Sequence, residues 1–133
     1  MQVHSGVRGW RFAGLLVACA IGSFVANASA ENGVSADTIL LGQSAALTGP
    51  TATLGKQLNS GARLYFDYIN QHGGIYGRKI ELKVLDDFNE PESAAKNTRA
   101  LIDEDHAFAL FGYVGTETGE ASLPLATQAR VPF

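Results

Sequence analysis

A glycine- and threonine-rich loop between a predicted strand and a predicted helix is the part of this sequence best suited to chemistry. Residues 107–123 read AFALFGYVGTETGEASL. The apolar run Ala107–Gly112 predicts a buried strand, Tyr113–Thr116 a loop, and the residues from Glu117 a helix with Thr116 as its N-cap. Backbone N–H groups at a helix N-terminus, together with a hydroxyl, can bind an anion. We therefore expect this loop to hold one end of a small solute, a carboxylate.

Two further patterns have residue types that could indicate sites of chemistry. The segment 49–56, GPTATLGK, resembles a phosphate loop, but five residues separate its glycines and Gln57 stands where a magnesium-binding Ser or Thr is needed. Nucleotide binding stays open as an alternative. Asp86 and Asp87 are neighbours in sequence, so at a strand end they point to opposite faces, and we interpret them as loop and cap hydrogen-bonding groups.

No catalytic or metal-binding arrangement can be drawn from the remaining residues. His72 and His106 are isolated, and we expect each to be a solvated residue near a helix end. No Cys/His/Asp cluster has metal-ligand spacing, and no nucleophile has a partner base. We therefore expect a protein that is not an enzyme and that needs no metal and no cofactor.

The first 30 residues predict a secretory signal peptide. Arg8 and Arg11 precede the apolar run 12–25, and Ala28-Ser29-Ala30 forms a cleavage pattern. The run holds 14 residues, whereas a membrane span needs roughly 20. The segment 16–19, LVAC, resembles a lipobox, so lipid anchoring at Cys19 is the alternative; we favour cleavage after Ala30 and a periplasmic protein.

The expected mature segment, 31–133, has a globular and mildly acidic composition. It keeps eight Lys and Arg against 13 Asp and Glu. The absence of a basic patch in its sequence argues against nucleic acid as a partner. The single Cys, Cys19, lies in the predicted signal peptide, so the expected mature segment cannot form a disulfide.

The elements that must position the loop alternate between strand and helix. The predicted order is a strand at 37–45, a helix at 53–72, a strand at 79–85, a helix from 89, the strand at 107–112, a helix to about 130, and a fourth strand from 131. This alternation predicts an α/β fold with a doubly wound parallel sheet. Ligands of such sheets bind outside the carboxyl ends of the strands, where the loops Ala46–Ala52, Asp86–Asn89 and Tyr113–Thr116 are expected.

Local patterns refine the predicted helices. In the first helix, Leu58, Ala62, Tyr65 and Ile69 are predicted to form the buried face, with polar residues including Asn59 and Asn70 largely opposite. Gly73 and Gly74 are expected to end this helix. The second helix is predicted to begin with a capping box, in which Asn89 is the N-cap, Pro91 lies in the first turn and Glu92 reaches back. Its buried face is predicted to comprise Ala94, Ala95, Thr98, Leu101 and Ile102.

Several of these segments, taken in order, resemble the start of the Leu/Ile/Val-binding family. These proteins are type I periplasmic solute-binding proteins of ABC importers. The resemblance covers essentially the whole of 31–133, and its most specific part is the run INQHGGIYGR with the downstream Asp-Asp and Pro. The matching segments are 39–49 with Gly55, 69–82, Asp86-Asp87 with Pro91, and 110–116 followed by Ala126 and Val131-Pro132.

The resemblance implies two α/β lobes that close on a hinge over a small solute. It implies that the hydroxyl of Thr116 and the N–H groups around Glu117 and Thr118 bind the α-carboxylate of the ligand. Tyr113 belongs to the same loop, and Leu54 matches a position that often supplies an aromatic wall. Two alternatives stay open: Thr116 as a plain N-cap, and Leu54 as a first-turn residue that does not touch the ligand.

This sequence also departs from the family pattern. Some members bridge the loops by a disulfide at the positions matching Asn89 and Gly115, where this chain has no Cys. Family members are about three times as long, so 31–133 is expected to be the N-terminal part of lobe I, truncated in the fourth strand, with little binding of its own.

The resemblance gives a function and two alternatives. The expected function is the substrate-binding component of an ABC importer for amino acids or related carboxylates and amides, with membrane permease subunits as partners. A ligand-sensing ectodomain of the same fold and a non-functional truncated reading frame are the alternatives.

Overall fold

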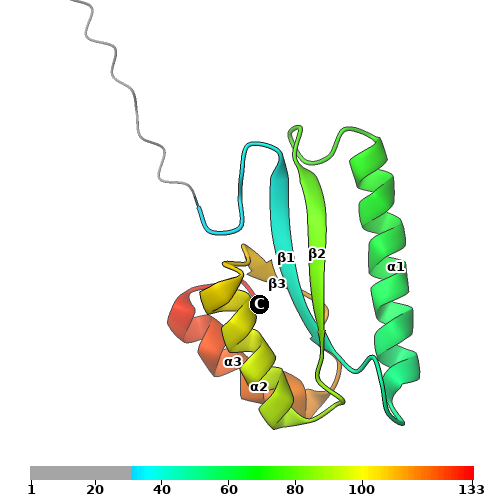
Figure 1. Cartoon of the computed structure of the whole chain (residues 1–133), viewed down its shortest axis with the longest axis vertical. Helices are drawn as coiled ribbons and strands as arrows, with labels where there is room; N and C mark the ends of the chain where they lie inside the picture. Colours follow the sequence, from blue (N-terminus) through cyan, green and yellow to red (C-terminus); the bar gives the residue numbers. More distant parts are fainter. Residues whose placement is uncertain (1–30) are drawn as a thin grey trace, which may run out of the picture.

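The computed structural model describes residues 31–133 as a parallel sheet with helices on both faces (Figure 1). The predicted α/β class is confirmed. The predicted signal peptide and Cys19 lie outside the described residues. The elements are β1 (Thr38–Ala45), α1 (Ala52–Gln71), β2 (Lys79–Asp86), α2 (Pro91–Arg99), the π-helical turn η1 (Ala100–Glu104), β3 (Ala109–Leu110) and α3 (Thr116–Ala129).

The central strand of the sheet is β1, in the order β2-β1-β3. Its eight residues all pair with β2, from Thr38 opposite Lys79 to Ala45 opposite Asp86. This places β2 at an edge, as its alternation of polar and apolar residues predicts. Because the strands are parallel, their carboxyl ends and the N-termini of α1, α2 and α3 lie at one edge of the sheet (Figure 1). We call this the carboxyl edge.

The third strand is shorter than predicted. Ala107–Gly112 was expected to be a strand, but only Ala109–Leu110 pairs as one. At Gly112 φ is +67°, in the left-handed region, which turns the chain away from the extended path. The predicted fourth strand does not form either: in 131–133 the carbonyl oxygen of Pro132 accepts one hydrogen bond from the Leu110 amide, at 2.8 Å.

The predicted buried face of α1 is correct at Ala62 and Ile69, which are half-buried, but the observed face is rotated from it by roughly a sixth of a turn. Leu58 and Tyr65 were expected to be buried, but they are 37% and 61% exposed. The face that contacts the sheet instead contains Gly55, Asn59 and Phe66. Gly55 is buried, and a Cβ atom built on it would lie only 2.0 Å from the carbonyl oxygen of Ala46. Because Gly55 has no side chain, this part of α1 can lie against the loop after β1.

Polar side chains on α1 also bind the sheet, contrary to prediction. Asn59 donates to the side-chain oxygen of Gln43 at 2.8 Å. Asn70 donates to the Ile80 carbonyl oxygen at 2.8 Å and accepts from the Ile80 amide at 2.7 Å. Both asparagines replace apolar contacts with hydrogen bonds, so a pattern built on apolar residues alone places them on the wrong face.

The other face of the sheet carries the apolar core. Leu101, Ile102, Leu110 and Ala126 form its buried cluster. The predicted face of α2 is confirmed, with Ala95 only half-buried. The helix does not stop at Arg99 but widens into η1, where the Asp105 amide donates to the Ala100 carbonyl oxygen at 3.0 Å. Both histidines are exposed near helix ends, as predicted.

Candidate functional site

The loop after β1 is held to the end of β2 by Asp86. The carboxylate of Asp86 accepts hydrogen bonds from the Thr48 hydroxyl at 2.6 Å, the Leu47 amide at 2.9 Å and the Phe88 amide at 3.0 Å. Burial raises the pKa of Asp86, but these donors outweigh it and the net pKa lies below the usual value. Asp86 is therefore a loop-fixing residue, as the sequence indicates.

Its neighbour Asp87 points the other way and is fully buried. It accepts hydrogen bonds from the Ser44 hydroxyl at 2.8 Å and the Asn89 amide at 2.9 Å. Ser44 in turn accepts from the side chain of Asn97 in α2, at 3.2 Å. The two carboxylates thus bind different partners and do not act as a catalytic pair.

The predicted capping box of α2 is wrong. The N-cap is Glu90 in an extended conformation, with Pro91 as the first helical residue and no side-chain cap bond within the described chain. Asn89 is instead in the left-handed region, with φ at +61°. Its amide is already bound to Asp87, so the turn closes one residue earlier than a capping box requires.

Gln43 connects β1 to two other elements of the carboxyl edge. It is fully buried; its amide nitrogen donates to the Gly112 carbonyl oxygen at 2.9 Å, and its oxygen accepts from Asn59. Sequence reasoning missed this residue. The signal was present, since a Gln and a Ser interrupt an otherwise apolar strand, and a buried polar side chain must find partners.

The N-terminus of α3 presents its amides at the carboxyl edge. The N-cap is Gly115, with φ at +103°, and Thr116 is the first helical residue, so the prediction of Thr116 as N-cap is wrong. The Gly119 amide donates to the Gly115 carbonyl oxygen at 3.1 Å. The preceding amides, those of Thr116, Glu117 and Thr118, have no acceptor within the helix, because the first turn of a helix contains none.

The predicted ligand-binding side chains differ in their availability. Thr116 and Glu117 are exposed, whereas Thr118 is buried and its hydroxyl donates to the Val114 and Gly115 carbonyl oxygens at 2.7 and 2.9 Å. Only the backbone amide of Thr118 is left for a ligand. The Thr116 hydroxyl, by contrast, lies at the surface beside these amides.

Tyr113 and Leu54 have different surroundings: Tyr113 is half-buried, whereas Leu54 is exposed. The Tyr113 hydroxyl bonds the hydroxyl of buried Thr98 at 2.8 Å, and its ring lies 4.8 Å from that of Phe133. Burial raises the pKa of Tyr113 to about 12; the Thr98 hydrogen bond opposes this shift and the charge of Asp87 adds to it. Leu54 is 61% exposed in the first turn of α1.

Asn89 and Gly115 are adjacent, although they lie in different loops. A Cβ atom on Gly115 would be 2.8 Å from the side-chain oxygen of Asn89. These are the positions that the family resemblance pairs through a disulfide. The loops after β2 and β3 therefore come together here without a covalent link.

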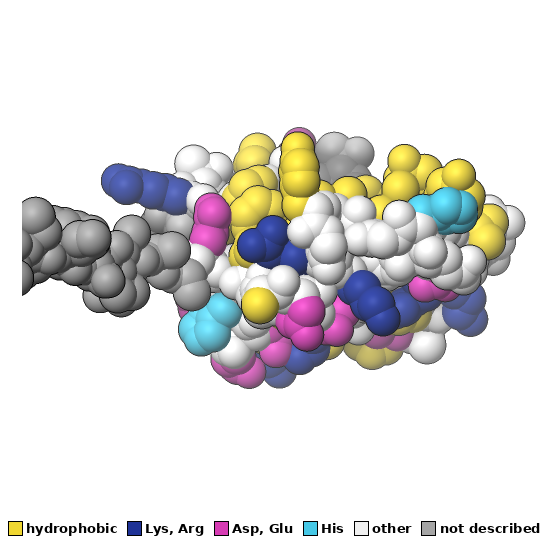
Figure 2. Space-filling view, turned by 90° about the horizontal axis from the view of Figure 1, so that it is seen from above, with side chains coloured by type: hydrophobic (Ala, Val, Ile, Leu, Met, Phe, Trp, Pro, Cys, Tyr) yellow, Lys and Arg dark blue, Asp and Glu magenta, His cyan; other side chains and the backbone are white. Residues whose placement is uncertain are grey.

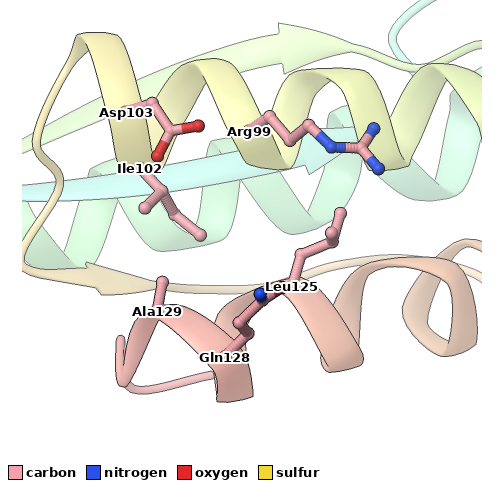
Figure 3. A pocket seen from close by; sticks show the side chains of 6 residues that line it. All are labelled: Arg99, Ile102, Asp103, Leu125, Gln128 and Ala129. Atoms are coloured by element: carbon pink, nitrogen blue, oxygen red, sulfur yellow. The ribbon is translucent and has the colours of Figure 1, made fainter.

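A separate hollow of about 340 Å³ lies between α2 and α3 (Figure 3). Ile102 in η1 and Ala129 at the last residue of α3 mark its position, at the end of these helices remote from the carboxyl edge. It is not the predicted site. Within 31–133, no group of three or more His, Cys, Asp or Glu is placed to hold a metal ion, and no helix is long and apolar enough to cross a membrane.

Comparison with known proteins finds a matching protein family and several similar proteins. The family model described as periplasmic binding protein matches residues 38–133. The Leu/Ile/Val-binding protein BraC3 of Rhizobium johnstonii is 34% identical over 88 residues, which are 66% of this chain and 23% of that protein. This chain thus spans about a quarter of the length of this curated relative.

Two solved structures resemble the fold closely. One is the branched-chain amino acid transporter substrate-binding protein LivJ of Streptococcus pneumoniae in complex with isoleucine, with a TM-score of 0.69 and 33% identity over 72% of this chain and 28% of that one. The other is a solute-binding protein of an ABC transporter from Rhodopseudomonas palustris in complex with 3,4-dihydroxybenzoic acid. Its TM-score is 0.65, with 35% identity over 72% of this chain and 26% of that one. These similar proteins are solute-binding proteins, not enzymes.

Proposed function

Because this chain belongs to the periplasmic binding protein family, we propose that it binds a small carboxylate at the N-terminus of α3. The observation that carries the proposal is the set of three amides at Thr116, Glu117 and Thr118, which face the carboxyl edge beside the Thr116 hydroxyl. A helix N-terminus favours an anion through its free N–H groups and its dipole. Hydrogen bonds to an ionised group are also stronger than neutral ones.

The ligands of the two similar structures support a carboxylate. Isoleucine and 3,4-dihydroxybenzoic acid differ in size, charge and shape, but both carry a carboxylate group. An amino acid or a related carboxylate is accordingly the solute class we propose here. Leu54, at the start of α1, and the ring of Tyr113 are the proposed apolar contacts. The residues 31–133 supply one wall of such a site, so we expect weak binding from this stretch alone.

We further propose that the protein serves an ABC importer as its substrate-binding component, in the periplasm and with permease subunits as partners. Residues 1–30 would direct its export. Mass spectrometry of the processed protein tests that step: a chain beginning at Glu31 supports cleavage after Ala30, and a lipidated chain beginning at Cys19 supports anchoring.

The binding proposal is tested by NMR titration of backbone amides with isoleucine and with isoleucinamide, which lacks the carboxylate. We expect isoleucine at millimolar concentration to shift the amides of Thr116–Thr118, and isoleucinamide to shift them several-fold less. Thr116→Val should weaken the response. The matched control is Thr127→Val near the other end of α3, where the hydroxyl bonds only the Leu123 carbonyl oxygen. Equal shifts with the two ligands, or none at these amides, would contradict the proposal.

A further inference from the structure

The segment 112–115, which joins β3 to α3, is attached to the sheet by a side chain. The backbone bonding to β1 ends one residue before it, where the Phe111 amide donates to the Gly42 carbonyl oxygen at 2.8 Å. One residue further on, the Gly112 carbonyl oxygen accepts from the side chain of Gln43 at 2.9 Å. Gln43 thus extends the attachment to β1 past the end of the strand, to the segment that leads into the amides proposed to bind the ligand.

Gln43 is itself held by a chain of hydrogen bonds that begins at the surface of α1. Arg63, which is exposed, donates to the side-chain oxygen of Asn59 at 2.9 Å. Asn59 donates in turn to the side-chain oxygen of Gln43 at 2.8 Å. With the bond from Gln43 to Gly112, the chain runs from a surface arginine to a loop carbonyl group. We call these four residues the relay.

The two ends of the relay determine the orientation of both side-chain amides between them. A backbone carbonyl oxygen can only accept, so Gln43 must turn its NH₂ group toward Gly112 and its oxygen toward Asn59. An arginine can only donate, so Asn59 must turn its oxygen toward Arg63 and its NH₂ group toward Gln43. Flipping either amide would place two acceptors or two donors against each other. The relay therefore has one arrangement, in which all donors point toward the loop and neighbouring bonds strengthen one another.

The loop lies directly against Gln43 because Gly112 has no side chain. Its φ is +67°, and a Cβ atom built on it would lie 2.8 Å from the side-chain nitrogen of Gln43. In a planar trans peptide the C=O and the next N–H point in opposite directions, so the bond from Gln43 orients the whole peptide plane between Gly112 and Tyr113. A short loop then leads from this plane to Thr116, the first residue of α3.

We propose that Gln43 is a positioning residue for the carboxylate site: through the relay it holds 112–115 in place and thereby aims the amides of residues 116–118. This role rests on the proposed binding of a carboxylate at those amides. Gln43 is fully buried, so it acts through the loop and not by touching the ligand. Aim matters because a hydrogen bond weakens steeply as its angle departs from linear. A site built from backbone amides thus depends on whatever orients the backbone.

Two substitutions of similar size separate positioning from a general loss of stability. Gln43→Met keeps the length of the side chain but leaves both of its hydrogen-bond partners unpaired. Asn70→Leu is the matched control, because it leaves the amide and the carbonyl oxygen of Ile80 unpaired, also between α1 and the sheet. That contact joins the last turns of α1 to the start of β2, at the end of the molecule that Figure 2 faces, opposite the carboxyl edge. Both variants should be less stable than the wild type.

NMR spectra of the ligand-free proteins test the position of the amides, and titration with isoleucine tests binding. Without ligand, we expect the amide shifts of residues 116–118 to change several-fold more in Gln43→Met than in Asn70→Leu. On titration, we expect the response of these amides to fall roughly fivefold in Gln43→Met, which corresponds to one neutral hydrogen bond, and by less than about twofold in Asn70→Leu.

Gln43→Glu at about pH 5 is the conservative variant that should restore the wild-type behaviour, because burial keeps its carboxyl group protonated. A protonated carboxyl group can donate to Gly112 and accept from Asn59, as glutamine does. Equal shifts in Gln43→Met and Asn70→Leu, or a Gln43→Glu protein that behaves like Gln43→Met, would overturn the positioning role. A wild-type protein that does not respond to isoleucine would instead refute the carboxylate site, and the ligand-free shifts would judge the role of Gln43 separately.

Discussion

Gly55 makes the contact on which the position of the loop after β1 depends, and Gly55→Ala tests this directly. In an exposed helix, Gly→Ala stabilises a protein because alanine loses less conformational freedom on folding. At Gly55 the added Cβ would lie 2.0 Å from the Ala46 carbonyl oxygen and 2.9 Å from its carbonyl carbon. Both are backbone atoms, so no flexible side chain can move aside.

The size of the effect follows from the displacement that the new methyl group requires. An ordinary contact would need α1 and the loop to separate by roughly 1 Å or more, and overpacking of this kind costs about 1–3 kcal/mol. Gly61→Ala supplies the reference, because it adds the same methyl group to the same helix in open space. That substitution should stabilise by about 0.5–1 kcal/mol. We therefore expect the two variants to differ by about 1.5–4 kcal/mol in the free energy of unfolding.

Urea unfolding followed by circular dichroism measures this difference. At a protein concentration of about 1 micromolar, which limits any self-association, we expect the transition midpoint of Gly55→Ala to fall by roughly 1 M relative to Gly61→Ala. The Ala46 and Leu47 amides should shift in NMR spectra of the folded Gly55→Ala protein. If the two variants had equal stability, the close approach of α1 to the loop after β1 would be refuted.

Three further outcomes are expected. Since the folded-state pKa of Tyr113 is raised to about 12 from 10.0, the unfolded chain loses this proton first; stability should be level below pH 10 and fall between pH 10 and 12, and Tyr113→Phe should remove that fall in a pH series of urea transitions. The lowered pKa of Asp86 makes stability depend on pH in the acidic range: its contribution is complete above the ordinary carboxyl pKa and is lost as pH falls through the folded-state pKa. Thr48→Val should raise the pKa of Asp86, which the NMR shift of its carboxyl carbon would report. Gln43→Leu should cost about 1–3 kcal/mol, because it strands the Gly112 carbonyl oxygen and the Asn59 amide; no loss on urea unfolding would show that this buried link is dispensable.

The sequence was sufficient to predict the order of elements from β1 to α3 and the edge of the sheet at which the loops after β1, β2 and β3 lie. Strand–helix alternation is a strong signal, and short connections between parallel strands leave few topologies. The sequence also predicted Pro91 in the first turn of α2 and the glycines that follow α1. Both predictions rest on the backbone conformations that proline and glycine adopt, which depend little on distant residues.

The errors occurred where hydrogen bonds to distant residues decide the structure. Asn59 faces the sheet because Gln43, 16 residues earlier, needs its amide. Asn89 is not an N-cap because Asp87 already holds its amide in a tighter turn. The helix α3 begins one residue earlier than predicted, because Gly115 is its N-cap and Thr116 its first helical residue. The N-cap has a φ of +103°, which glycine adopts readily and threonine does not. A local sequence pattern describes each residue by itself, whereas the conformation at these positions depends on a second residue that the pattern does not include.

The central position of β1 has a consequence for how the chain folds during synthesis. Both of its partners come later in the sequence, and its first paired residue, Thr38, must wait for Lys79. At about 5–20 residues per second, that separation corresponds to roughly 2–8 s in which the ribosome has released an apolar strand with nothing to pair with. The α1 crossover must close a long loop before the sheet can start. We therefore expect β1 to gain protection from pulsed hydrogen exchange together with β2 and later than the helices.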